Sequence, residues 1–221
     1  MTVSRSIALM LAALSLGGVI GGAGVAASAA DSKPAAPVAA PAKAGEVVYR
    51  EFIQGNPKSK VTVIEYASLT CGHCKHFQDE IYPELKKAYI DTGKIRFVYR
   101  DFPLDGLAAG GALLARCAPG DKGKVLIDLM FKNQAEWVRS PSPLEPLKGY
   151  AQLAGMDSAA VDACLKNEGI MNKIREVQET ASSQYKVQST PTFFINEEKL
   201  EGAQPFEAMA KVIDKAIADA K

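Results

Sequence analysis

Two cysteines separated by two residues, Cys71 and Cys74, lie where an apolar run meets a helical pattern. Thiols at this spacing can hold a metal ion, anchor a haem, form a structural disulfide or exchange electrons. A c-type haem requires a histidine directly after the second cysteine, and residue 75 is a lysine. A purely structural disulfide that closes so short a loop would constrain the unfolded chain very little. These two roles are therefore disfavoured.

A structural zinc site needs four ligands in tetrahedral geometry. Cys71, Cys74 and His76 could supply three of them. The other two cysteines, Cys117 and Cys164, lie far along the chain in a region with helical patterns. We therefore expect no metal site, and the sequence indicates no cofactor.

The remaining role is redox exchange. A cysteine just before the first turn of a helix lies among unpaired N–H groups at the positive end of the helix dipole. This position stabilises a thiolate at Cys71, and His73 adds a hydrogen-bond donor or a positive charge. A lower thiol pKa stabilises the reduced form and makes the disulfide more oxidising. The motif thus predicts a redox couple in which Cys71 reacts with substrate and Cys74 faces inward and resolves.

The elements around the motif form a βαβ pattern. Residues 60–69 are a β-branched apolar run, typical of a strand buried on both faces. An amphipathic helix follows, which Pro83 should kink. Its apolar face carries Phe77, Ile81, Leu85 and Ala88. A second strand is predicted over 94–104, parallel to the first.

The rest of the chain first turns helical and then returns to β character. Helices are predicted over 107–117, 124–138, 144–154, 157–166 and 168–186. Strands are predicted over 190–196 and 199–202, and a final helix begins at Pro205. The fold class is therefore α/β, a small core that carries a helical insertion.

The first 29 residues have the pattern of a signal peptide. Arg5 precedes an apolar Gly- and Ala-rich stretch over 7–26, and Ala27-Ser28-Ala29 fits the small-x-small cleavage rule. The alternative is a retained membrane anchor, because the stretch is nearly long enough to span a bilayer. Both alternatives predict an exported protein.

Residues 30–46 are rich in Ala and Pro and read as a solvated linker. About 175 residues remain, enough for one well-buried domain. Lys and Arg number 26 against 25 Asp and Glu. This balance gives no indication of a nucleic-acid partner.

Three stretches, 61–77, "YRDFPL" (99–104) and "TPTFFIN" (190–196), resemble the DsbA family of thioredoxin-fold disulfide oxidoreductases. The resemblance covers nearly all of the chain after the linker, and it implies a thioredoxin fold with an inserted all-helical domain. The parts expected are 47–104 for the first part of the thioredoxin fold, 105–187 for the helical insertion and 188–221 for the second part.

The resemblance also implies site residues. It places a cis proline opposite the cysteines, at Pro191 after Thr190, although X-Pro bonds are usually trans. An extended substrate would pair with the backbone of Thr190 and bind against Pro191. It also implies a buried acid six positions before the first cysteine, which is Glu65. Burial would raise the pKa of Glu65, so that it could take a proton from Cys74.

Cys117 and Cys164 are expected to form a structural disulfide. The alternative is a pair of buried free thiols, which the apolar character of cysteine permits. An oxidising compartment and an even number of remaining cysteines favour a bond. The resemblance allows it as well, since some family members carry a second disulfide in the helical domain.

The function implied is that of an exported, periplasmic oxidase, a monomer that donates its disulfide to reduced, unfolded secreted proteins. A quinone-linked membrane partner of the DsbB type would reoxidise it. The pair between the cysteines is Gly-His, as in protein disulfide isomerases, rather than the Pro-His of the best-known DsbA proteins. An isomerase or reductase with the same fold therefore stays an alternative, and a metal or copper carrier that uses the same thiols is a further one.

Overall fold

The computed structural model describes residues 49–220. Its centre is a five-stranded sheet in the order β1-β3-β2-β4-β5. The strands are β1 (Phe52–Gly55), β2 (Thr62–Ala67), β3 (Arg96–Asp101), β4 (Thr192–Ile195) and β5 (Glu198–Glu201). β2 and β3 are parallel and the other neighbours are antiparallel, so the predicted βαβ unit is confirmed.

The edge strand β1 was not predicted. It has only four residues, which alternate between half-buried and exposed, and it ends in Gln54 and Gly55. Gly55 has a φ of +79°, and a side chain there would meet the carbonyl oxygen of Ile95. So short and polar a segment gives no period-2 signal.

The helix between β2 and β3 is continuous but irregular. It consists of α1 (Gly72–His76), the π-helical turn η1 (Phe77–Ile81), α2 (Tyr82–Leu85) and the π-helical turn η2 (Lys86–Ile90). Pro83 lies next to η1, where its missing N–H leaves the regular hydrogen-bond pattern incomplete. The structure thus has a widened turn beside Pro83, and the predicted kink stays a prediction.

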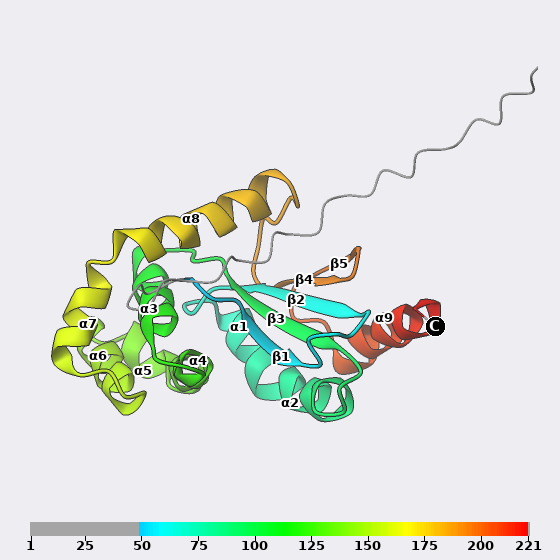
Figure 1. The fold of residues 1–221 in the computed structure, drawn as a ribbon, viewed down its shortest axis with the longest axis horizontal. Helices are drawn as coiled ribbons and strands as arrows, with labels where there is room; N and C mark the ends of the chain where they lie inside the picture. Colours follow the sequence, from blue (N-terminus) through cyan, green and yellow to red (C-terminus); the bar gives the residue numbers. More distant parts are fainter. Residues whose placement is uncertain (1–48, 221) are drawn as a thin grey trace, which may run out of the picture. The chain divides into compact units, whose positions relative to one another are not determined.

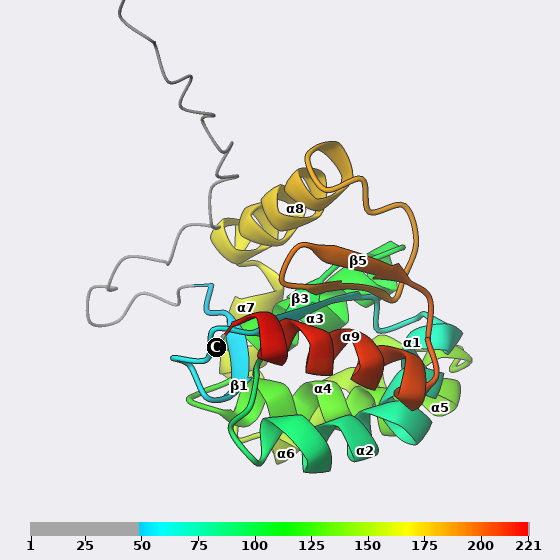
Figure 2. The same cartoon turned by 90° about the vertical axis from the view of Figure 1, so that its right-hand side faces the viewer.

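Helices cover both faces of the sheet (Figures 1 and 2). The α1–η2 helix and α9 (Phe206–Asp219) pack on the face that carries Val63, Phe97 and Phe193. α8 (Glu168–Ser183) packs on the opposite face, where Tyr66 is buried. β2 is thus buried on both sides, as predicted.

A block of helices lies between β3 and β4 in the chain and to one side of the sheet (Figure 1). It consists of α3 (Gly106–Cys117), α4 (Lys122–Lys132), α5 (Gln134–Val138), α6 (Leu144–Leu153) and α7 (Ser158–Leu165), and α8 follows. Asp105 caps α3 by accepting a hydrogen bond from Ala108 N at 2.7 Å. Asp157 caps α7 in the same way through Ala160 N.

The predicted helix over 124–138 is wrong, because two helices occupy it. The break is at Asn133, whose backbone leaves the helical region at φ −103° and ψ 19°. Its side-chain Nδ2 donates to Leu129 O at 2.8 Å and so occupies a carbonyl near the end of α4. Asparagine competes with the backbone in this way, which explains the interruption.

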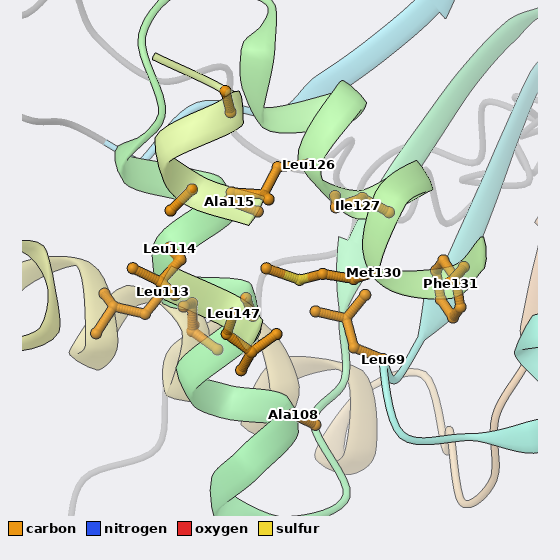
Figure 3. Packing of buried hydrophobic residues seen from close by; sticks show 14 of the residues in the cluster. Leu69, Ala108, Leu113, Leu114, Ala115, Leu126, Ile127, Met130, Phe131 and Leu147 are labelled. Carbon is orange, nitrogen blue, oxygen red and sulfur yellow. The ribbon is translucent and has the colours of Figure 1, made fainter. Parts of the chain in front are cut away.

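The helical block has no core separate from the sheet. Figure 3 shows apolar side chains of α3, α4 and α6 packed together with Leu69, which lies just after β2. The same buried cluster continues to Cys71 and Tyr99. The described residues belong to one compact unit, so the boundaries of the helical insertion stay a prediction.

No helix within residues 49–220 combines the length and hydropathy needed to cross a bilayer. The predicted signal peptide and linker lie outside the described residues.

Candidate active site

Cys71 and Cys74 occupy different positions at the start of α1. Cys71 is the N-cap residue, in extended conformation, and its Sγ accepts a hydrogen bond from Cys74 N at 3.3 Å. Cys74 lies within the first turn and is fully buried. Cys71 is only 8% exposed, so it is more covered than the sequence suggested, but it is the outer of the two thiols.

The surroundings lower the pKa of the Cys71 thiol to about 5. The largest cause is the hydrogen bond from the Cys74 side chain, and burial opposes it. The backbone N–H groups of Cys74 and His73 stabilise the thiolate further. These backbone donors belong to the free N–H groups of a helix start, the feature from which the sequence predicted a thiolate.

The pKa of Cys74 moves in the opposite direction. Burial raises it most, and the hydrogen bond to Cys71 and the charge of Glu65 raise it further. Two thiols three residues apart therefore differ strongly in acidity. Cys71 is the thiolate of the reduced couple, and Cys74 keeps its proton.

His73 contributes less directly than predicted. Its side chain is exposed, and in the described part of the chain no hydrogen bond joins its imidazole to Cys71. Only its backbone N–H acts on the thiolate. A charge on the exposed ring would be screened by water. A catalytic role for the ring stays a prediction.

The Thr190–Pro191 segment lies against Cys71, and the peptide bond is cis, as the resemblance implied. Cys71 Sγ donates to Thr190 O at 3.2 Å, which brings the start of β4 to the tip of α1. Thr190 is buried, and its hydroxyl has no hydrogen-bond partner within the described residues. Substrate binding by Thr190 and Pro191 stays a prediction.

Glu65 is fully buried on β2, paired in register with Tyr99 on β3 and Phe193 on β4. Its Oε2 accepts from Gln78 Nε2 at 3.0 Å, whereas its Oε1 has no hydrogen-bond partner within residues 49–220. Burial raises the pKa of Glu65 to about 8. Its charge also raises the pKa of Cys74. The predicted burial of Glu65 is confirmed.

Sequence reasoning missed the residues that oppose this pKa shift. The largest opposing cause is the positive charge of Lys124, and the hydrogen bond from Gln78 is the next. Lys124 comes from α4, forms an ion pair with Asp128 and lies 5.1 Å above the Tyr82 ring. Nothing in the local sequence around Lys124 connects it with β2. Only the packing of α4 against η1 brings it near.

Cys117 and Cys164 form the predicted disulfide, which joins the end of α3 to α7. Their Cα atoms are 6.0 Å apart and their sequence separation is 47 residues. Among residues 49–220, no three His, Cys, Asp or Glu side chains are grouped so that they could hold a metal ion. Cys71 and Cys74 are the free cysteines of the described residues.

A model of the thioredoxin family matches residues 48–215. A Rickettsia bellii protein named "Putative protein-disulfide oxidoreductase" is 34% identical over 173 residues, which are 77% of this chain and 66% of that protein. The chain spans 62% of the length of a similar Rickettsia prowazekii protein. A Bacillus cereus protein named "Probable disulfide bond formation protein D" is 28% identical over 174 residues, 74% of this chain and 77% of its own length.

Solved structures agree with these relatives. The crystal structure of Wolbachia pipientis alpha-DsbA1 is 30% identical, covers 78% of this chain and 94% of its own, and superposes with a TM-score of 0.72. The shared fold supports the family that the relatives indicate. The paired cysteines of this chain, which lie at the start of a helix, support it as well. The chain belongs to the thioredoxin family and, within it, to the DsbA-like protein-disulfide oxidoreductases.

Proposed function

We propose that this protein is an exported thiol:disulfide oxidase that donates the Cys71–Cys74 disulfide to reduced, unfolded secreted proteins. The observation that carries the proposal is the opposite shift of the two thiol pKa values, Cys71 to about 5 and Cys74 upward. A stabilised thiolate favours the reduced form of the couple, so its disulfide tends to accept electrons.

The reaction begins when a substrate thiolate attacks Sγ of Cys71 in the disulfide. The Cys71–Cys74 bond breaks, a mixed disulfide forms, and Cys74 leaves with the electron pair. Its site is fully buried, so the new thiolate needs a proton at once. Glu65 is protonated below its pKa of about 8 and supplies this proton.

A second thiolate of the substrate then attacks the substrate sulfur of the mixed disulfide. Cys71 leaves as a thiolate, and its low pKa makes it a good leaving group. The substrate has lost two electrons and gained a disulfide, and the enzyme holds the dithiol. One of the two substrate protons replaces the proton that Glu65 gave to Cys74, and the other passes to solvent. A quinone-linked membrane partner of the DsbB type then accepts the two electrons from the dithiol and restores the Cys71–Cys74 disulfide.

The proposal includes a periplasmic location and a monomeric protein. These parts rest on the signal-peptide pattern of residues 1–29 and on the DsbA-like family. Thr190 and Pro191 are proposed to hold the substrate chain beside Cys71, because this segment already touches the Cys71 sulfur.

The Gly-His pair keeps an isomerase or reductase as the second candidate. The two activities differ in what the protein does to a scrambled substrate. An oxidase consumes its own disulfide in proportion to the thiols oxidised. An isomerase corrects wrong disulfides in catalytic amounts while it stays reduced.

The test uses the oxidised protein and a reduced, unfolded secreted test protein. We expect stoichiometric disulfide transfer and none with Cys71→Ala. Cys74→Ala, first converted by glutathione disulfide to the mixed disulfide of Cys71 with glutathione, should release glutathione and trap the test protein on Cys71, as non-reducing mass spectrometry resolves. A Cys117→Ala/Cys164→Ala variant is the control and should retain transfer. Trapping by Cys71→Ala alone would reverse the roles of the two thiols. Rearrangement of scrambled substrate without net oxidation would favour the isomerase, and tight stoichiometric Cu(I) binding without thiol oxidation would favour a copper carrier.

A further inference from the structure

The loop that carries Cys71 is held from the helical block by one buried amide. Gln134, the first residue of α5, is 8% exposed. Its Nε2 donates to Leu69 O at 2.8 Å and to Cys71 O at 3.0 Å. A primary amide has two N–H groups, so one side chain can satisfy both carbonyls.

The surrounding packing supports this contact. Figure 3 shows the side chain of Leu69 close to Met130 of α4. The helix α3 passes so near that a Cβ on Gly111 would lie 2.8 Å from Leu69 Cδ1. On the other side of Cys71, Lys75 Nζ donates to Phe131 O at 3.0 Å. The α4–α5 corner, residues 130–134, therefore holds the chain on both sides of Cys71.

The helix break at Asn133 creates this arrangement. α4 ends there, and a new helix starts at Gln134. The break is thus the point at which the helical block meets the active-site loop.

We infer that Gln134 is a positioning residue for the redox couple, which holds the backbone of Cys71 so that the Cys74 N–H reaches the Cys71 sulfur. The N–H and the sulfur are joined by a hydrogen bond of 3.3 Å. A hydrogen bond of this kind weakens as its distance and angle depart from the optimum. Freedom in the loop before α1 would therefore weaken it. The inference goes beyond the proposed function, because it holds for any thiol exchange at Cys71.

The measurable consequence is a loss of stability of the reduced form. Without the amide, two carbonyls lose their side-chain partner and the loop can shift. The thiolate then has poorer donors, whereas the disulfide form has no thiolate to stabilise. The Cys71 pKa should rise and the couple should become less oxidising.

The test compares Gln134→Met with Gln178→Met. Both replace a glutamine amide that donates to a backbone carbonyl, but the amide of Gln178 bonds to Pro103 O at 2.8 Å and not to the loop that carries Cys71. The titratable and charged groups around the thiolate are the same in both variants: His73, Cys74, Lys75 and Glu65. Thiolate absorbance against pH and the equilibrium with glutathione are measured for each folded protein.

For Gln134→Met we expect the Cys71 pKa to rise by about one unit and the equilibrium constant to fall about tenfold, which corresponds to about 30 mV. Gln178→Met should leave both values unchanged, even where it lowers the melting temperature. Gln134→Asn, one methylene shorter, should shift both values in the same direction and serves if Gln134→Met does not fold.

A folded Gln134 variant with an unchanged pKa and potential would overturn the inference and leave Gln134 a structural residue. Equal shifts in the Gln178 and Gln134 variants would overturn it as well. Failure of the proposed function is distinguishable, because the unsubstituted protein would then reach its glutathione equilibrium and yet oxidise no test protein.

Discussion

At the scale of single residues, the site depends on two environments that meet within one helical turn. Cys71 is at the N-cap, where donors converge on its sulfur, and its pKa falls to about 5. Cys74 is enclosed, and burial raises its pKa. Position along a helix, rather than residue type, makes one thiol the nucleophile and keeps the other protonated.

Glu65→Gln should stabilise the protein more as the pH rises. Burial raises the folded-state pKa of Glu65 from 4.5 to about 8. A raised pKa contributes stability that is fully present below pH 4.5 and is lost as the pH rises through about 8. Glutamine is never charged, so the free energy of unfolding of the variant, relative to the unsubstituted protein, should rise across this interval by up to about 5 kcal/mol. Urea unfolding of the oxidised protein at several pH values measures it.

Glu80→Gln is the matched control, because Glu80 is exposed on the same helix. Its effect on the unfolding free energy should be small at every pH. A Glu65→Gln effect equally flat across this pH interval would mean that the carboxyl is charged in the folded protein. Glu65→Gln should also slow the first step of disulfide exchange, because the leaving Cys74 loses its proton donor.

The sequence was sufficient to find Cys71 and Cys74, because both depend on their place in a strand–motif–helix pattern. The burial of Glu65 was implied by the resemblance to the DsbA family and not by the pattern itself. The sequence was not sufficient for Gln78, Lys124 or Gln134. These side chains reach the site only after separate helices have packed, and their own neighbours in the sequence carry no sign of it. The exposed imidazole of His73 shows the same limit, because the direction of a side chain is not encoded in the spacing of the motif.

At the scale of elements, the long periodic segments were predictable and the interruptions were not. The buried strand β2 and the helix from Gly72 to Ile90 followed from hydrophobic periodicity. The break between α4 and α5 did not, because the apolar pattern continues through Asn133 while its side chain bonds Leu129 O. β1 was missed because four residues are too few to show a period.

Replacing both cysteines of the Cys117–Cys164 disulfide by alanine should destabilise the protein by about 4 kcal/mol. The bond closes a separation of 47 residues between α3 and α7, and its loss restores the entropy of that loop to the unfolded chain. Urea unfolding in non-reducing conditions measures the difference. The reference protein is Cys71→Ala/Cys74→Ala, which removes the short loop and should change stability much less. Equal losses in the two double variants would show that loop entropy is not the cause.

At the scale of the whole molecule, the core of the helical block extends to residues of the sheet, and a buried cation lies where the two meet. Arg116, near the end of α3, has a fully buried side chain, and its Nε donates to Asp101 Oδ2 of β3 at 2.6 Å. Its Nη2 donates to Tyr99 O at 3.3 Å, and its Nη1 donates to Arg50 O. The guanidinium also lies 3.8 Å from the centre of the Phe52 ring. One residue of the helical block thus binds both β1 and β3.

Arg116→Met should therefore lower the free energy of unfolding by far more than Arg100→Met, which replaces an arginine of the sheet. The first leaves the carboxylate of Asp101, which is 1% exposed, without its partner, and breaking a buried pair costs about 3–5 kcal/mol. Arg100 pairs with Glu51 at 3.1 Å, where the two side chains are 11% and 27% exposed, and its loss should cost about 1–2 kcal/mol. Asp101→Asn in the Arg116→Met background should recover part of the loss, since it removes the unpaired charge. Urea unfolding of the three variants measures these differences in the free energy of unfolding. Similar costs for the two arginines, or no recovery by Asp101→Asn, would show that the charge of Arg116 does not join the helical block to the sheet.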